Sequence, residues 1–154
     1  MKPNFNENYK GIKCRVCLVK EGDVEEEISL CNADKIHALV KDELGSADRE
    51  IMLSILLTTK SQLIGVETVA IGSLNSTSLV PREIFKGAIL GNAASIVLCH
   101  NHPSGDLTPS NEDINLTKEM IEAGKLLGIQ VLDHLIVSSK GFASLRDHMT
   151  FKPI

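Results

Sequence analysis

SIVLCHNHPSGDLTPSNED, residues 95–113, contains three predicted elements in immediate succession. Ser95–Cys99 is a short apolar run, which predicts a buried strand. Pro103 and Gly105 then rule out a continuing strand ladder, so a loop must follow. Ser110 precedes a long stretch with apolar residues at helical spacing that ends at Gly128, which predicts a helix beginning just after Ser110.

The sequence on either side of this segment also alternates between strand and helix patterns. Two further helices are expected, from Asn32 or Asp34 to about Leu44 and from Pro81 to Gly91. In these two helices the residues expected to point inward are Ile36, Leu39, Val40, Ile84, Phe85, Ala88 and Ile89. In the helix after Ser110 they are Ile114, Thr117, Met120, Ile121 and Leu127. Expected strands are Ile12–Val19, Ile51–Leu57, Leu63–Ile71, Ile129–Val137 and Phe142–Leu145. The second and third strands are predicted to form an antiparallel pair, and the last two a hairpin. We therefore expect an α/β protein whose sheet is mixed, as in α+β folds, and is flanked by helices.

Composition indicates an ordinary globular domain. The chain has 154 residues, 43% of them hydrophobic and 23% charged, and we expect a flexible segment at residues 1–11 and one domain over residues 12–154. A net charge of −4 does not support binding to nucleic acid through bulk charge. The sequence has no apolar run of ~20 residues and no signal-peptide core, so we expect a cytoplasmic protein without a membrane span. In that compartment its four cysteines are expected to be free thiols. The sequence does not indicate an oligomeric state.

Residues 100–113 bring together side chains suited to a metal ion. His100 and His102 are separated by one residue in extended chain, so both imidazoles point to the same side. Asp113 falls in the first turn of the next helix and can reach back to them. Two nitrogens and one oxygen leave a fourth tetrahedral position for water, which is typical of catalytic Zn²⁺. A single Zn²⁺ per chain is therefore predicted.

The same residues also admit structural interpretations. Ser110-x-x-Asp113 is a helix-capping pattern, and in isolation capping is the better interpretation. A histidine within an apolar strand, such as His134, is more often a satisfied core residue than a ligand. The metal site is favoured by the combination: two histidines at the exit of a buried strand, then a loop, a hydroxyl and an acid at a helix start.

The pattern H-x-H-x7-S-x2-D, formed by His100, His102, Ser110 and Asp113, resembles that of the JAMM metalloenzymes, the catalytic members of the JAB/MPN family. HNHPSG at residues 100–105 and LDHLIV at residues 132–137 are similar to the RadC-like branch. The resemblance spans roughly residues 12–145. It implies a JAB/MPN-like fold with cytidine-deaminase-like layering, and a metallopeptidase or isopeptidase acting on peptide or protein substrates. Longer members carry an N-terminal helical region resembling DNA-binding domains, for which we expect no room here.

The resemblance also implies roles for individual residues. His100, His102 and Asp113 correspond to the zinc ligands, and Ser110 to a serine that helps to hold the oxyanion. The family's general base precedes an apolar strand, which matches Glu50. Glu67 and Glu83 remain alternatives, although Glu83 is also explained by a helix N-terminus and Glu67 by a solvent-facing strand position. Near neutral pH, such a base takes a proton from water activated by the metal and returns it to the leaving amine.

Two further classes of function are weighed against hydrolysis. A DNA-repair-associated or nuclease-like metalloprotein is suggested by family association, whereas a base deaminase would need H-x-E followed by P-C-x-x-C, which this sequence lacks. Some MPN domains have lost their ligands and serve only as interaction modules. This chain keeps every ligand position, which favours catalysis.

Overall fold

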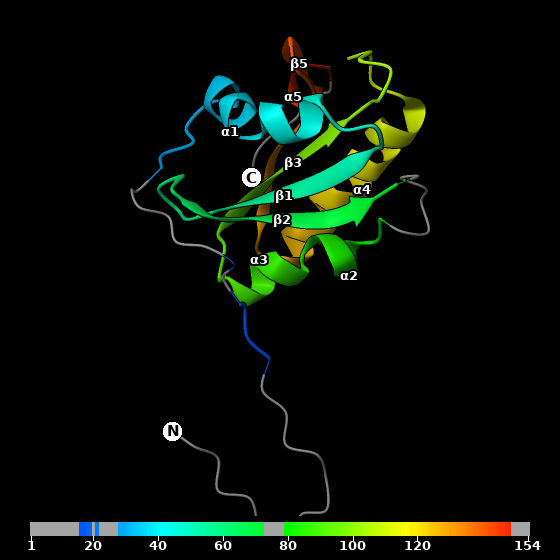
Figure 1. Ribbon diagram of the computed structural model, residues 1–154. Coiled ribbons are helices and arrows are strands. Elements are labelled where there is room, and N and C mark those ends of the chain that lie inside the picture. Colours follow the sequence, from blue (N-terminus) through cyan, green and yellow to red (C-terminus); the bar gives the residue numbers. More distant parts are fainter. Residues whose placement is uncertain (1–15, 20, 22–27, 73–78, 149–154) are drawn as a thin grey trace, which may run out of the picture.

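The structure is a computed structural model that describes residues 16–19, 21, 28–72 and 79–148 (Figure 1). The expected flexible segment at residues 1–11 and the first half of the expected strand Ile12–Val19 lie outside these residues. The strands are β1 (Ile51–Leu57), β2 (Leu63–Ile71), β3 (Ser95–Asn101), β4 (Gln130–Ser138) and β5 (Gly141–Ser144). The helices are α1 (Ala33–Gly45), α2 (Pro81–Ile84), α3 (Lys86–Leu90), α4 (Asn111–Leu127) and α5 (Leu145–His148).

The strands form one mixed sheet in the order β2-β1-β3-β4-β5. Strand β1 pairs antiparallel with both β2 and β3, and β4 pairs antiparallel with β5. Strands β3 and β4 run parallel, so they need a crossover, which α4 supplies. The antiparallel pair, the final hairpin and the mixed sheet predicted from sequence are all confirmed.

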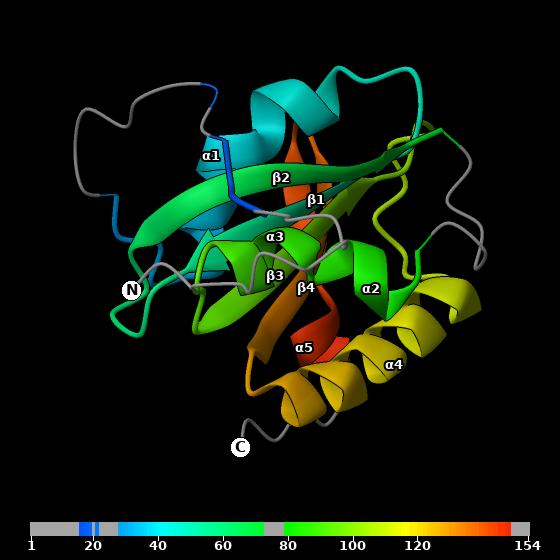
Figure 2. The same ribbon diagram turned by 90° about the horizontal axis from the view of Figure 1, so that it is seen from below.

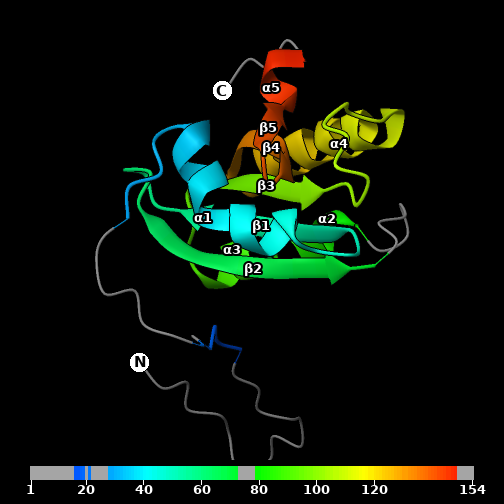
Figure 3. The ribbon, with the colours of Figure 1, turned by 45° about the horizontal axis from the view of Figure 1, so that its top comes forward.

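Side chains on the two faces of the sheet pack into two separate cores. Alternate residues of β1 point to opposite faces, because the side-chain period of a strand is two. Leu53 and Ile55 join the core under α1, whereas Met52 and Leu56 join the core with α2 and α4. Figures 2 and 3 show α1 on one side of the sheet, with α2, α3 and α4 on the other. This three-layer arrangement is consistent with the JAB/MPN-like fold that the sequence led us to expect.

Helix α4 begins and ends as the sequence predicts. The Ser110 side chain accepts from the backbone N–H of Asp113, and the Asp113 carboxylate accepts from the N–H of Ser110, which completes a capping box. Gly128 ends the helix in the left-handed conformation, with φ of 71°, where glycine carries no side-chain penalty. Among the described residues, no helix is long and apolar enough to cross a membrane.

Several expected elements differ from the structure. Residues 16–19 are exposed and form no strand, because β-branched sequence makes a strand only where a neighbouring strand offers pairing. The helix expected from Pro81 to Gly91 is divided at Phe85 into α2 and α3, and the short helix α5 was not predicted. Three residues expected to point inward are exposed: Leu39, Ile89 and Leu127.

Candidate metal centre

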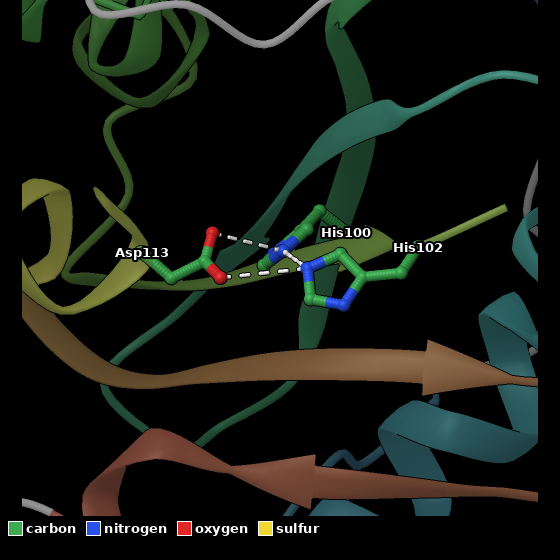
Figure 4. A group of neighbouring side chains, drawn as sticks. All are labelled: His100, His102 and Asp113. Atoms are coloured by element: carbon green, nitrogen blue, oxygen red, sulfur yellow. Dashed lines mark hydrogen bonds and ion pairs between the residues drawn. The ribbon is translucent and has the colours of Figure 1, made fainter. Parts of the chain in front are cut away.

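The predicted cluster lies where β3 ends and α4 begins. His100 is on the face of β3 that carries Ile96 and Leu98, so it points toward α4. Its Nε2 atom is 3.0 Å from Nε2 of His102 and 3.1 Å from Oδ1 of Asp113. His102 Nε2 is 3.4 Å from Oδ2 of Asp113. Figure 4 shows the three side chains converging: His100 comes from β3, His102 from the residue just after its end, and Asp113 from the first turn of α4.

The loop after His102 fixes the orientation of its ring. The Nδ1 atom of His102 is 2.8 Å from the backbone carbonyl oxygen of Asp106. A carbonyl oxygen only accepts, so in this hydrogen bond Nδ1–H donates, and Nε2 of the neutral ring keeps its lone pair. That lone pair faces His100 and Asp113, the two other members of the cluster.

Asp113 belongs to the helix cap and to the cluster at once. Its Oδ2 accepts from the hydroxyl of Ser110 at 2.6 Å and from the backbone N–H of Ser110 at 2.8 Å, while Oδ1 is the oxygen nearer to His100. Burial raises the pKa of this carboxyl, but the neighbouring His100 and the Ser110 hydrogen bonds lower it more. The pKa of Asp113 therefore lies well below its usual range, and the group is a carboxylate at neutral pH. Asp113 therefore caps helix α4 and also contributes an oxygen to the cluster with His100 and His102.

Glu50 lies one residue before β1, beside the histidine strand. Met52 pairs with His100, and extending this antiparallel register by two residues sets Glu50 opposite His102, on the same face of the sheet.

The side chain of Asn101 holds both peptide units that flank Glu50. It accepts from the N–H of Ile51 at 2.8 Å and donates to the carbonyl oxygen of Arg49 at 2.9 Å. We call this pair of hydrogen bonds the Asn101 brace. The brace cannot be seen in the sequence, because it depends on which strand lies beside β3.

The rival glutamates have other partners. Glu67 lies on β2, paired with Ser54 of β1, and its carboxylate accepts from the backbone N–H of Gly87 at 3.1 Å. It therefore caps the first turn of α3, and burial raises its pKa. Glu83 forms ion pairs with Lys86 and Arg82 at the surface, which lower its pKa. These contacts give both residues structural roles in the helices α2 and α3.

Two buried residues behind His100 were not predicted to take part in the site. His134, on β4, has 0% exposure, and its Nε2 is 2.8 Å from Nδ1 of His100. Thr117, on α4, is equally buried, and its hydroxyl is 2.6 Å from Nδ1 of His134. Burial above all, with the charge of His100, lowers the pKa of His134 well below its ordinary value. His134 is thus a satisfied core histidine, as expected from sequence. That its partner is a member of the cluster follows only from the parallel pairing of β3 and β4.

The donor atoms fit a metal ion. One ligand atom from each of His100, His102 and Asp113 lies within 4.8 Å of the others. A tetrahedral ion with bonds of ~2.0–2.1 Å separates its ligand atoms by about 3.3–3.4 Å. The measured separations of 3.0, 3.1 and 3.4 Å are close to that value. Acceptor atoms this close, with the Nε2 lone pair of His102 facing the Asp113 carboxylate, need a cation or a shared proton between them.

The layered α/β fold and this cluster at a strand end define a JAB-type domain with a site able to bind a metal ion. A family profile described as "RadC-like JAB domain" matches residues 30–150. The chain belongs to this family.

Curated relatives share the family but carry uninformative names. The chain is 53% identical over 113 residues to a UPF0758 protein of Desulforamulus reducens, an alignment that covers 73% of this chain and 50% of that protein. It is 49% identical over 116 residues to a UPF0758 protein of Moorella thermoacetica (75% and 51%), and 48% identical over 128 residues to one of Clostridium kluyveri (83% and 55%). The chain thus spans about half the length of the curated relatives it matches.

Proposed function

We propose that this chain is a zinc-dependent amide hydrolase, a metallopeptidase or isopeptidase acting on a peptide or protein in the cytoplasm. The observation that supports it most is the geometry of His100, His102 and Asp113, whose donor atoms converge with separations suited to a tetrahedral ion. Two imidazoles and one carboxylate are the donor types that catalytic zinc takes, with one position left open.

Glu50 is the proton carrier in this proposal. A zinc ion held by His100, His102 and Asp113 would polarise the substrate carbonyl and would make a nearby water more acidic. The Glu50 carboxylate accepts a proton from the attacking water and returns it to the leaving amine nitrogen, so no net proton is consumed in these two transfers. The Asn101 brace supports this role, because it fixes the backbone on both sides of Glu50 next to the histidine strand.

Ser110 has a second role in the proposal. In the structure its hydroxyl proton is directed at Oδ2 of Asp113, which also accepts from the Ser110 backbone N–H. The backbone hydrogen bond remains when the hydroxyl turns away. The hydroxyl is then free to donate to an oxyanion that develops on the substrate carbonyl, while Asp113 stays oriented.

The test combines metal analysis with hydrolysis. Protein expressed in zinc-replete medium is expected to contain about one zinc per chain and to release amines from a peptide library that includes Lys ε-amide bonds. Glu50→Gln is expected to retain zinc and melting temperature but to lose at least ~10²-fold in rate, since it removes a proton carrier and no ligand. Glu67→Gln and Glu83→Gln serve as matched controls and are expected to retain hydrolysis.

Three outcomes contradict parts of the proposal. Trace zinc in the parent, no higher than in His100→Ala, would overturn the metal site. Full activity in Glu50→Gln with none in Glu67→Gln or Glu83→Gln would move the base to a rival glutamate. Stoichiometric zinc without hydrolysis of any library member would favour an interaction module over an enzyme.

A further inference from the structure

A buried chain of hydrogen bonds leads away from the metal-facing side of His100. It runs from Nδ1 of His100 to Nε2 of His134 (2.8 Å), and from Nδ1 of His134 to the hydroxyl of Thr117 (2.6 Å). It ends where that hydroxyl donates to the backbone carbonyl oxygen of Asp113 (2.6 Å). His100, His134 and Thr117 are all at least 99% buried. The proposed mechanism gives no role to His134 or Thr117.

The hydrogen bond from Thr117 to Asp113 determines which atom donates in each of the other hydrogen bonds. A hydroxyl has one proton, and Thr117 gives it to a carbonyl oxygen, which can only accept. Toward His134 the hydroxyl must therefore accept, so the proton of His134 sits on Nδ1. A neutral imidazole carries one N–H, and Nε2 of His134 then accepts from Nδ1–H of His100. The lone pair of His100 is consequently on Nε2, the atom that faces His102 and Asp113.

We propose that Thr117 and His134 are positioning residues that set the tautomer of His100, so that its Nε2 lone pair is held toward a metal ion. This inference rests on the proposed metal site and adds the device that keeps the site ready to bind. A neutral histidine free in water populates both tautomers, and only one of them presents Nε2 as a ligand. Hydrogen bonds to the ring nitrogen opposite the metal are known to tune affinity in this way.

These hydrogen bonds also connect the two elements that carry the proposed metal ligands. Thr117 lies one helical turn after Asp113 and bonds to the carbonyl of that residue, whereas His134 reaches His100 across the parallel strands. The backbone of Asp113 on α4 is thereby linked to the ring of His100 on β3 through buried polar atoms alone. Packing side chains of similar shape would fill the same space, but they would not select a tautomer.

The first measurement needs no variant. Long-range ¹H–¹⁵N spectra of the histidine side chains in metal-free protein report which ring nitrogen carries the proton. We expect Nδ1–H on both His134 and His100. His134 protonated on Nε2, with Nδ1 bare, would overturn the proposal. Because this readout uses metal-free protein, it decides the tautomer even if the parent binds no zinc and the proposed function fails.

The second measurement is zinc affinity by competition with a chromogenic chelator. Thr117→Val keeps the shape but removes the acceptor for Nδ1–H of His134, and its dissociation constant for zinc is expected to rise ~10–100-fold. Thr117→Ser keeps the hydroxyl and is expected to stay within about threefold of the parent, well below that effect. Thr68→Val, at an exposed position of β2, is the matched control and should leave affinity unchanged.

Melting temperatures of the metal-free variants separate tautomer control from loss of structure. Thr117→Ala removes the same hydroxyl without placing a methyl group against His134, so it repeats the test should the valine variant fail to fold. Parental zinc affinity in a folded Thr117→Val or Thr117→Ala protein would overturn the proposal. So would a loss of affinity in Thr117→Ser as large as in Thr117→Val.

Discussion

Ser110 and Asp113 each combine a structural and a chemical task, and substitutions separate the two. A capping box alone predicts that Ser110→Ala and Asp113→Asn each cost about 0.5–2 kcal/mol of stability and leave metal binding intact. The proposed site predicts that Asp113→Asn loses zinc, because an amide is a much poorer ligand than a carboxylate. Ser110→Ala is expected to keep zinc and to lose ~10²–10³-fold in kcat. Zinc content, melting temperature and peptide hydrolysis are measured for both variants.

The decisive comparison is the zinc content of Asp113→Asn. If this variant keeps stoichiometric zinc and loses only stability, residues 110–113 are an ordinary helix start, and His100 and His102 lack their third partner. Stability loss in Ser110→Ala decides nothing by itself, because both interpretations predict it.

The sequence predicted the members of the cluster but not their supports. His100 and His102 could be grouped because the strand period places them on one side, and Asp113 because the loop and helix start are visible in the sequence. His134 and Asn101 could not be assigned in the same way. Their partners, His100 and the backbone around Glu50, lie on neighbouring strands, and strand order and register are not readable from local pattern.

At the scale of one element, the close approach of α4 to the turn that follows it is testable. A Cβ atom on Gly124 would lie 2.4 Å from the carbonyl oxygen of Ile129 and 3.3 Å from Phe85 and Val131. Gly124→Ala gains about 1 kcal/mol in helix propensity but overpacks against backbone, which costs ~1–3 kcal/mol. The difference predicts a net loss of up to about 2 kcal/mol in the free energy of unfolding, measured by urea denaturation.

The exposed Glu122 of the same helix provides the control. Glu122→Ala removes one surface ion pair with Lys125 and is expected to change stability by less than about 0.5 kcal/mol. A Gly124→Ala protein more stable than the parent would show that α4 can move away from β4, and that the close approach is not required.

Local pattern predicted the long elements better than the short ones. Helix α4 has apolar periodicity, a capping box and a terminal glycine that agree with one another. The segment 81–91 has the same kind of periodicity, but the structure divides it at the buried Phe85, and the Glu67 carboxylate from β2 caps the second piece. That cap comes from a residue twenty positions away, so no local signal marks the division.

For the molecule as a whole, net charge gives an expectation about nucleic acid. The chain has 16 basic and 20 acidic residues, and nonspecific DNA binding depends on releasing counterions from phosphates through Lys and Arg. We expect a dissociation constant for duplex DNA weaker than ~10⁻⁶ M at physiological salt, measured by titration of a fluorescent duplex at two salt concentrations. Binding tighter than ~10⁻⁷ M would instead support a DNA-associated role.

The Asn101 brace has a consequence for protein engineering. A designer who transplants the His-x-His segment to another scaffold carries over the two imidazoles. The start of β1, which the intervening Asn101 holds in place, stays behind. Replacing Asn101 to alter the surroundings of the histidines would release Arg49 and Ile51 instead. The portable unit therefore includes β1 together with β3 and the helix that follows it, a larger piece than the sequence pattern that reveals it.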